Sequence, residues 1–446
     1  MSSRSRRQPG PNVPSVYFHP MSFDARICFD CVRTGPEACA GCRAPAGSGR
    51  HAREFDVSAT ATVTNEARIL DWLGGQRQAM LELLQALVDT DSGSYDKRGV
   101  DAVGEKIRGF LEAAGIACDT VPNPRFGDAI RATVGNAGSG NRTILLMGHR
   151  DTVFPKGEAA RRPFRLEGER AYGPGVADMK AGLVMNSFVL AAFARFGGAP
   201  APLVGLYTAD EEIASPFSRA VIEAEARKAR AVFNAEPGRL TGNVVTGRKG
   251  GVFMRLEVFG KAAHSGGNFQ DGISAIGELA HKIAALHALT DLDKGTTVNV
   301  GLISGGQSVN TVAPHATGEI DLRYVEPEHR DEAVAAIEAI VARSFVPGTS
   351  ARLEITGEFL PLVENPESRR LFEHYVRAAA DVGLSIGGDF TGGCADSGFS
   401  AAVGAPTLCA TGPVGGKAHS PDEFLKVETM VPRAQALALA ILRLAH

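Results

Sequence analysis

The sequence predicts an α/β fold: a mixed, mostly parallel sheet flanked by helices, with a ferredoxin-like domain inserted into it. Two observations lead to this prediction. Apolar strand segments alternate with amphipathic helices from residue 66 to residue 246, and this order is typical of a parallel sheet covered on both faces. The segment 247–359 instead follows the order β-α-β-β-α-β, which is the ferredoxin-like arrangement.

The elements of the first part follow from the spacing of apolar residues. Two early segments have helical spacing, and we expect helices at 76–90 and 99–114. Short apolar runs between turn residues predict strands at 129–135, 142–149, 203–209 and 231–235. Further helices are expected at 179–196 and 217–230.

The inserted segment and the end of the chain are divided by the same spacing rules. The insert is expected to contain strands at 250–259, 296–304, 315–325 and 351–356, with helices at 271–290 and 329–344. The mixed pattern then returns with a helix at 367–382, a Gly-rich segment, a strand at 406–411 and a C-terminal helix at 426–445.

These patterns divide the chain into three parts. Residues 1–62 are rich in Arg, Pro, Gly, Ser and Ala without periodicity, which indicates a disordered extension. A main domain is expected from 63–246 together with 360–446, and an inserted domain from 247–359. A chain of 446 residues exceeds the usual size of one hydrophobic core, so more than one domain is the expected outcome.

Composition and charge argue against a nucleic-acid-binding, membrane or secreted protein. The net charge of −3 gives no overall basic surface for nucleic acid or an anionic membrane. No continuous apolar run reaches the length of about 18 residues that suggests a membrane span. The basic N-terminus has no apolar stretch after its Arg-Arg pair, which makes it a poor secretory signal. We therefore expect a cytoplasmic protein without nucleic-acid or membrane partners.

Four cysteines, Cys28, Cys31, Cys39 and Cys42, form a C-x2-C-x7-C-x2-C cluster in the extension. Paired C-x2-C units are common in structural zinc sites, but the gap here is short and few apolar residues surround it. Three interpretations stay open: a small zinc knuckle, a redox-sensitive disordered tail, or a tail that lies upstream of the true start codon.

Acidic residues and histidines collect where the predicted strands end. In open α/β sheets, ligands bind beyond the carboxyl ends of strands. Clustered carboxylates repel one another, and a bound cation removes that repulsion. Oxygen and imidazole ligands without sulfur suit a catalytic Zn²⁺ pair, and Co²⁺ or Mn²⁺ suits them as well. The residues at these positions are His149, Asp151, Asp178, Asp210, Glu211, Glu212, Glu236 and His419.

The segments around these residues resemble a known family. They read "GHRDTV", "YGPGVADMKAG", "TADEEIAS", "NAEPG", "GKAAHSG", "SGGQSVNTVAPHATGEIDLRY" and "GGCADSGF…GGKAHSPDE", in that order, over residues 66–446. The chain is similar to the co-catalytic zinc metallopeptidases, which include glutamate carboxypeptidase, acetylornithine deacetylase, succinyl-diaminopimelate desuccinylase and the aminoacylases. The glutamate carboxypeptidase branch looks closest. The resemblance implies a zinc exopeptidase-like catalytic domain that carries a lid and dimerisation domain.

The resemblance also implies a metal-ligand set for two Zn²⁺ ions per subunit. Asp178 would bridge the two ions. His149 and Glu236 would complete one site, and Glu212 and His419 would complete the other. A chain with this set is expected to be active, because a catalytically dead scaffold would have lost a ligand or the catalytic base.

Other roles follow from the same resemblance. Glu211 would be the general base that activates a metal-bridging water, and Asp151 would accept a hydrogen bond from His149 and set its tautomer. The peptide bond between Asp178 and Met179 is expected to be cis. Met179 and Ala181 stand where relatives commonly carry Asp and Gly, but neither position is a ligand.

The inserted domain is expected to contribute residues that bind the substrate. His264 would reach the partner subunit's active site and stabilise the oxyanion, which implies a homodimer through this domain. Asn310 and Arg323 match positions that bind the substrate's free carboxylate, and Gly392 and Gly393 would bring backbone close to the substrate. Alternatively, Arg323 forms an ordinary salt bridge on a strand and the two glycines form a plain turn, without a role in substrate binding. A hinge near 245–248 and 358–362 would close the cleft over the substrate.

Together these expectations describe a dinuclear zinc-dependent hydrolase. It would cleave an amide bond beside a free carboxylate, as a carboxypeptidase, a dipeptidase or an N-acyl amino acid deacylase. The alternative is an N-carbamoyl amino acid amidohydrolase of the same superfamily. Those relatives usually carry His where Glu236 stands, so Glu236 favours the peptidase and deacylase side.

Overall fold

The structure, a computed structural model, describes residues 64–136 and 142–444. The predictions for the N-terminal extension, including its four cysteines, lie outside these residues. One described helical stretch, Val176–Phe196, is long and apolar enough by composition to cross a membrane. Its most apolar window is 94% buried inside the fold, as in the core helix of a globular domain.

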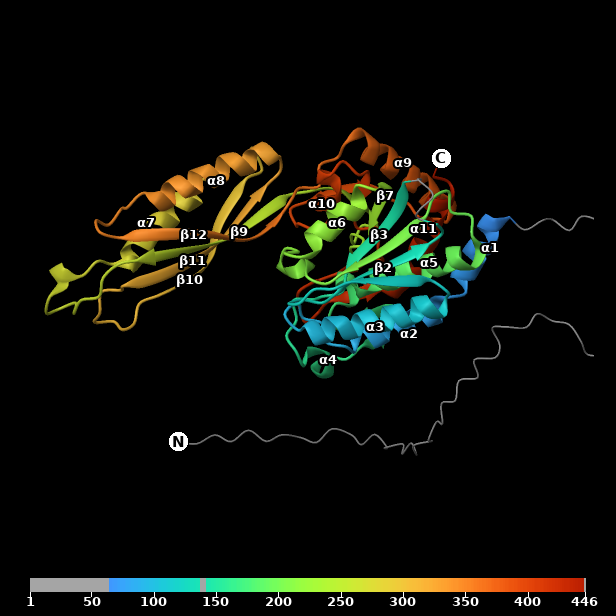
Figure 1. Cartoon of the computed structure of the whole chain (residues 1–446), viewed down its shortest axis with the longest axis horizontal. Coiled ribbons are helices and arrows are strands. Elements are labelled where there is room, and N and C mark those ends of the chain that lie inside the picture. The colour runs from blue at the N-terminus through green and yellow to red at the C-terminus, as the bar shows by residue number, and fades with distance from the viewer. Residues whose placement is uncertain (1–63, 137–141, 445–446) are drawn as a thin grey trace, which may run out of the picture. The chain divides into compact units, whose positions relative to one another are not determined.

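A six-stranded sheet forms the centre of the main domain (Figure 1). Its order is β1-β2-β6-β3-β7-β14. The four strands β6, β3, β7 and β14 are parallel, whereas β2 runs antiparallel to β6 and β1 antiparallel to β2. The mixed, mostly parallel sheet expected from the sequence is therefore confirmed. The strand bounds are β1 Ala117–Val121, β2 Ala129–Val134, β3 Thr143–His149, β6 Leu203–Thr208, β7 Ala229–Asn234 and β14 Thr407–Leu408.

Helices cover both faces of this sheet because the side chains of β3 alternate between two apolar clusters. Ile144 and Leu146 pack in the large cluster that includes α5, whereas Leu145 and Met147 pack with α6 and α10 on the other face. The helix bounds are α1 Asn65–Gly74, α2 Arg77–Val88, α3 Lys97–Ala113, α4 Glu158–Arg161, α5 Ala181–Phe196, α6 Ser218–Ala226, α9 Pro366–Asp381, α10 Ser397–Ala402 and α11 Met430–Leu442.

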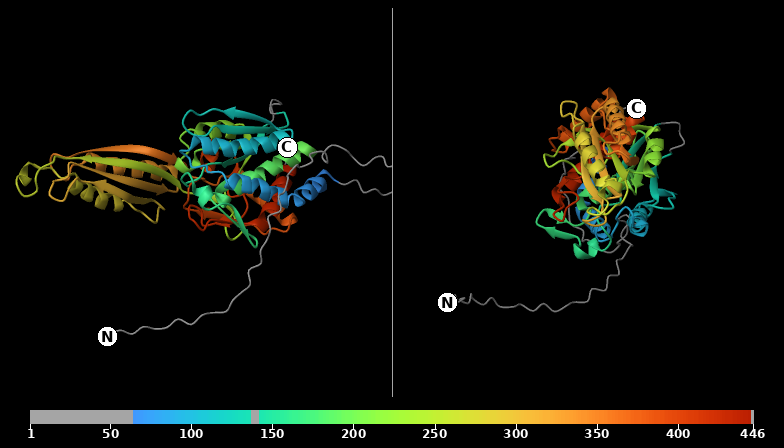
Figure 2. Two further views of the ribbon diagram at one scale, coloured as in Figure 1. Left: turned by 90° about the horizontal axis from the view of Figure 1, so that it is seen from below. Right: turned by 90° about the vertical axis from the view of Figure 1, so that its left-hand side faces the viewer.

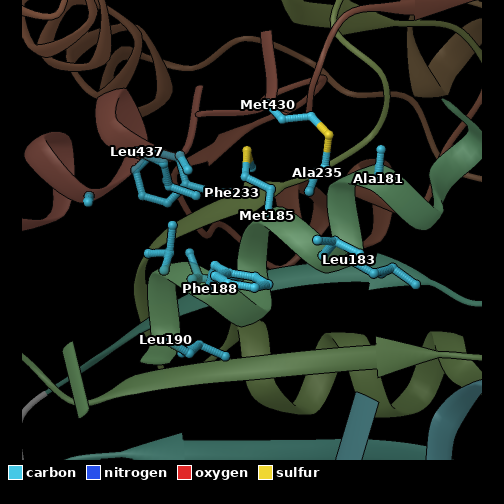
Figure 3. Close-up of a cluster of buried hydrophobic side chains, with 14 of the residues drawn as sticks. Ala181, Leu183, Met185, Phe188, Leu190, Phe233, Ala235, Met430 and Leu437 are labelled. Atoms are coloured by element: carbon cyan, nitrogen blue, oxygen red, sulfur yellow. The ribbon is translucent and has the colours of Figure 1, made fainter. Parts of the chain in front are cut away.

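Helix α5 lies in the middle of the core of the main domain. Residues 181–193 of this helix are all buried, which a helix with only one apolar face would not tolerate. Figure 3 shows Met185 and Phe188 of α5 among side chains from β7 and α11, including Phe233 and Met430. The N-terminus of α5 is thereby held in place, and the predicted ligand Asp178 lies in the turn just before it.

A second sheet of four strands forms the inserted segment, with the order β10-β11-β9-β12 and every neighbour antiparallel. Helices α7 and α8 lie on one face of this sheet (Figures 1 and 2) and share its apolar cluster. The predicted β-α-β-β-α-β order is observed. Bounds are β9 Gly250–Phe259, α7 Ala275–His287, β10 Thr297–Gly305, β11 His315–Tyr324, α8 Pro327–Ala342 and β12 Ser350–Phe359.

Some elements differ from the sequence prediction. The strand expected at 406–411 is only two residues long, because Ala410 adopts a positive φ of 57° that an extended strand does not allow. Helix α1 was not expected, although Thr64 caps it by accepting a hydrogen bond from the Ala67 amide. Two small sheets were also not expected. One sheet consists of β4 Arg165–Glu167, β5 Arg170–Tyr172, β15 Gly415–Gly416 and β16 Phe424–Lys426. The other consists of β8 Val244–Arg248 and β13 Gly388–Thr391.

Candidate metal centre

Five polar side chains meet at the carboxyl edge of the parallel strands. His149 is the last residue of β3, and Glu236 follows β7 by two residues. Glu212 lies in a short 3-10 turn, Glu211–Ile213, that begins three residues after β6. Asp178 lies in the kinked turn Val176–Lys180 before α5, and His419 lies in the loop between β15 and β16. The sheet topology brings these segments together, as expected for an open α/β sheet.

Asp178 faces one histidine with each of its carboxylate oxygens. Its Oδ1 is 3.3 Å from Nε2 of His149, and its Oδ2 is 3.4 Å from Nε2 of His419. Glu212 approaches the second histidine, with 3.1 Å between its Oε2 and Nε2 of His419. Glu236 approaches the first, with 3.8 Å between its Oε1 and Nε2 of His149. The donors therefore form two groups that share Asp178.

The donor atoms fit divalent cations. His149, Glu211 and Glu236 offer ligand atoms within 4.8 Å of one another, and so do His149, Asp178 and Glu212. Oε1 of Glu236 is buried and has no hydrogen-bond partner among the residues that the structure describes. A buried carboxylate oxygen without a partner is costly unless a cation occupies the space in front of it.

The electrostatics of the cluster lead to the same conclusion. Burial raises the pKa of Glu211 well above its ordinary value, and the neighbouring Glu236 adds to the rise. Burial likewise raises the pKa of Glu236 to about 7, although the nearby charge of Arg248 opposes the rise. Hydrogen bonds to Asp178 and Glu212 raise the pKa of His419 to about 10. Protons are thus held on groups that a divalent cation would otherwise neutralise.

Asp151 connects His149 to the turn that carries Glu211 and Glu212. Its backbone carbonyl is 3.0 Å from Nδ1 of His149, and its carboxylate Oδ1 is 3.4 Å from the same nitrogen. The amides of Glu211 and Glu212 each donate to the Asp151 carboxylate at 3.1 Å. Ser94 Oγ also donates to this carboxylate, at 2.6 Å. One fully buried carboxylate therefore orients His149, a candidate ligand, and positions two glutamates.

Glu423 plays a similar part for Asp178, and sequence reasoning missed it. Its side chain is 0% exposed, and its carboxylate accepts hydrogen bonds from the amides of Gly175, Ala177 and Asp178 at 3.1, 2.8 and 2.9 Å. The only local signal was an acidic residue four positions after His419 in "HSPDE". The peptide bond after Asp178 is cis, as predicted.

His264 and Asn310 lie on neighbouring loops of the inserted segment. The amide of Ser265 donates to the Asn310 carbonyl at 2.9 Å, and both residues are exposed. Nδ1 of His264 accepts hydrogen bonds from the amides of Gly266 and Gly267 at 3.1 and 3.0 Å. Both ring contacts are to its own loop, and neither links His264 to the carboxylate cluster.

Arg323 pairs with Asp321 on the same strand. Its Nε and Nη2 are 2.7 and 3.0 Å from the two Asp321 oxygens, and its Nη1 is 2.6 Å from Sγ of Cys394. Cys394 follows Gly393, and Nη1 of Arg248 donates to both of their carbonyls at 3.1 Å. The structure therefore places Arg323 beside the Gly-rich loop. Arg248 holds that loop in place, and sequence reasoning missed this residue as well.

Comparisons with known proteins identify the family of this chain. The model of the peptidase family M20/M25/M40 matches residues 145–443. Carboxypeptidase G2 from Pseudomonas sp. (strain RS-16) is 27% identical over 393 residues, which cover 86% of this chain and 94% of that protein. Acetylornithine deacetylase from Erwinia tasmaniensis is 25% identical over 389 residues, 82% and 98% of the two chains. An M20 family metallo-carboxypeptidase from Sulfolobus solfataricus aligns with a TM-score of 0.68 at 18% identity, over 81% of this chain and 98% of that one.

Proposed function

The chain belongs to the peptidase family M20/M25/M40, and on that premise we propose that it is a dinuclear hydrolase that cleaves an amide bond beside a free carboxylate. Membership makes it a metal-dependent enzyme of the metallopeptidase class. The observation that carries the proposal is the position of Asp178, whose two oxygens each face a different histidine. A carboxylate placed in this way suits a bridge between two cations.

Five residues would hold the two ions, with Zn²⁺ as the proposed metal and Co²⁺ or Mn²⁺ as substitutes. His149 and Glu236 would bind one, Glu212 and His419 the other, and Asp178 both. When bound, the ions would polarise the scissile carbonyl and make a water molecule acidic enough to attack at neutral pH. The unpartnered oxygen of Glu236 supports this assignment, because a bound cation would compensate it. An N-carbamoyl amidohydrolase usually has His at that position, so Glu236 favours the peptidase and deacylase side.

Glu211 is the proposed general base. Its Oε2 lies 3.8 Å from Nε2 of His149, at the edge of the donor cluster. With the ions bound, its deprotonated Oε2 would take a proton from the attacking water and then return it to the leaving nitrogen. The backbone amide of Glu211 donates to the Asp151 carboxylate, and this contact would keep the base aligned while it gains and loses the proton.

The inserted domain, residues 247–359, would bind the carboxylate side of the substrate and pair with a second copy. Arg323 and Asn310 would bind the free carboxylate, and Gly393 would let the backbone approach. Arg323 would exchange its ion pair with Asp321 for the substrate. His264 would donate from Nε2 to the oxyanion in the partner's site.

The proposed dimer contact is the edge strand β10. Its outer edge has unpaired backbone groups, and Leu302 and Ile303 on it are 69% and 68% exposed. Ile276 on α7 adds a further exposed apolar side chain. An apolar edge strand of this kind pairs readily with a copy of itself around a two-fold axis. We also propose a cytoplasmic location, where the described cysteines Cys118, Cys394 and Cys409 would stay free thiols.

The test is turnover of a panel of dipeptides and N-acyl amino acids, measured before and after removal of metal by a chelator. We expect activity to disappear with the metal and to return when Zn²⁺, Co²⁺ or Mn²⁺ is added. Metal analysis should find two ions per chain at saturation. Turnover that persists in the chelated protein would contradict the metal mechanism.

A further inference from the structure

A pocket of about 540 Å³ opens beside Glu212, outside the donor cluster. Three short segments line it: 93–96 before α3, 152–156 after β3, and the turn residues Glu212 and Ile213. This volume lies within the range of about 300–1,000 Å³ that is usual for small-molecule sites. Glu212 belongs both to the pocket wall and to the proposed second metal site, so a group bound here would lie next to that site.

The pocket walls are held by the same hydrogen bonds that hold the metal site. Gly93 and Thr152 form a parallel bridge, and the amide of Thr152 donates to the Ser92 carbonyl at 2.9 Å. Ser94 Oγ donates to the buried Asp151 carboxylate, which also accepts from the Glu212 amide. All three segments therefore connect through one short network, so the pocket is formed before a ligand binds.

Most of the surface that lines the pocket is apolar, and the charged side chains in the lining are paired. Tyr95 and Val153 are 74% and 43% exposed, and such exposure of large apolar groups beside a reaction site suggests that a ligand covers them. The remaining apolar lining residues are Phe154, Pro155 and Ile213.

Both carboxylates among the lining residues have partners. Asp96 is 3.3 Å from Nζ of Lys156, and Glu212 is 3.1 Å from Nε2 of His419. The lining therefore offers no unpaired carboxylate to a substrate ammonium group, and burying an unpaired ammonium there would be costly.

The opposite end of the donor cluster has a different character. The charge of Arg248 acts on Glu236, and Arg248 binds the carbonyls of Gly393 and Cys394. Arg323 contacts Cys394 in turn. The cationic groups suited to a substrate carboxylate thus lie at the Glu236 end, and the apolar pocket lies at the Glu212 end. A substrate that spans the cluster would place its carboxylate toward the arginines and its acyl group in the pocket.

We propose that this pocket is the acyl subsite and that it takes an uncharged aromatic or bulky apolar acyl group. The preferred substrates are then N-acyl amino acids with such a group, and dipeptides with a free N-terminal ammonium are poor substrates. This inference rests on the proposed function and specifies the substrate class of the same site.

The test compares three substrates with the same C-terminal amino acid. 3-Phenylpropanoyl and phenylalanyl substrates differ only by the α-ammonium group, and the N-acetyl substrate lacks the ring. We expect kcat/KM for the 3-phenylpropanoyl substrate to exceed that for each of the other two by about tenfold or more, since one apolar group in a fitted pocket discriminates 10- to 200-fold. Equal kcat/KM values, or a preference for the phenylalanyl substrate, would overturn the proposal.

Tyr95→Ala supplies the second arm of the test. It should lower kcat/KM for the 3-phenylpropanoyl substrate about tenfold and change that for the N-acetyl substrate less than twofold. The control is Leu292→Ala, because Leu292 is 76% exposed but lies in the inserted domain, and this variant should change neither value. An equal loss on both substrates, or no loss on either, would contradict the assignment of the pocket.

Binding of the acid product separates this proposal from the proposed function. 3-Phenylpropanoate should bind the metal-loaded wild-type chain in a calorimetric or NMR titration and bind Tyr95→Ala about tenfold more weakly. If no substrate is hydrolysed but this difference appears, the proposed function fails, and the pocket stands only as a binding site for the aromatic group. If amides are hydrolysed but 3-phenylpropanoate binds both proteins equally, the pocket assignment fails and the proposed function stands.

Discussion

At the residue scale, two buried carboxyl groups outside the proposed ligand set hold the candidate site together. Asp151 orients His149 and positions the amides of Glu211 and Glu212. Glu423 accepts three amide hydrogen bonds from the turn that carries Asp178. Each is a buried carboxyl group that accepts several directed hydrogen bonds, so each fixes one backbone turn relative to the rest of the cluster. Accurate placement of the ligands follows from these two residues as much as from the ligands themselves.

Glu211→Gln tests the proposed base. The substitution keeps the size of the side chain and removes its ability to accept a proton. We expect kcat to fall about 10²- to 10⁴-fold, with two metal ions still bound per chain. Steady-state kinetics together with metal analysis measures both quantities. A variant that binds both ions and keeps full turnover would exclude Glu211 as the base.

Glu423→Gln tests the support of Asp178. The new amide group has only one acceptor oxygen for three backbone donors, so the turn that carries Asp178 should lose its fixed position. We expect metal affinity, measured by competition with a chelating dye, to fall about 10- to 100-fold. Asp422→Asn is the matched control, because Asp422 is the neighbouring acid and its side chain is 74% exposed. Unchanged affinity in Glu423→Gln would show that the turn keeps its position without this carboxylate.

At the element scale, the elements of the inserted segment are placed as their periodicity predicts. The pattern of alternate burial in β9 and β11 matches their position inside the four-stranded sheet. Strand β10 differs, since it lies at the sheet edge and its second half is exposed. Exposed apolar side chains on an unpaired edge are the feature that a second copy would cover.

Leu302→Arg tests this edge as the dimer contact. A guanidinium at the centre of a self-complementary apolar contact would face its own symmetry copy and lose hydration. We expect the dimer to dissociate into monomers in analytical ultracentrifugation. Activity should fall as well, because His264 would no longer reach the partner's site. Leu292→Arg, at a similarly exposed position in the turn before β10 and outside the strand, should leave the dimer intact; dissociation of both variants would mean that the strand itself has no special role.

At the scale of the whole molecule, metal and stability are coupled. In the metal-free chain the raised pKa of Glu236 means that its contribution to stability is lost as pH rises from about 4.5 to about 7. His419, whose pKa is raised from 6.5 to about 10, contributes stability below 6.5 that is lost as pH rises toward 10. Between pH 6 and pH 8, both raised pKa values therefore lower the stability of the metal-free chain as pH rises.

We therefore expect the metal-free chain to become less stable from pH 6 to pH 8. Bound metal removes this loss, because it needs the deprotonated ligands and binds more tightly as pH rises. The difference in Tm between the metal-loaded and metal-free chains should increase over this interval. At a metal concentration 100 times Kd, binding to the folded state alone adds about 2.7 kcal/mol. Differential scanning calorimetry at several pH values measures this difference, and a constant or decreasing difference would contradict the proposed ligands.

The order of the helices and strands and the group of candidate ligands could be predicted from the sequence alone. The alternation of helices and strands and the β-α-β-β-α-β order are local patterns, because side-chain periodicity reflects the burial of each element. The order of the motifs indicated His149, Asp178, Glu212, Glu236 and His419 as a group, and the structure brings these residues together. The family assignment and the cis bond after Asp178 followed from the same motifs.

Only the tertiary structure decided how distant segments meet. The Glu423 hydrogen bonds and the two roles of Asp151 join residues far apart in the chain, and no periodic pattern records such contacts. Strands β4, β5, β15 and β16 are two or three residues long, too short for a periodic signal. The acyl pocket depends on three turns that converge on one buried carboxylate. Hydrophobic patterning reports whether a residue is buried, whereas the partners of a buried polar group are set by the packing of the whole chain.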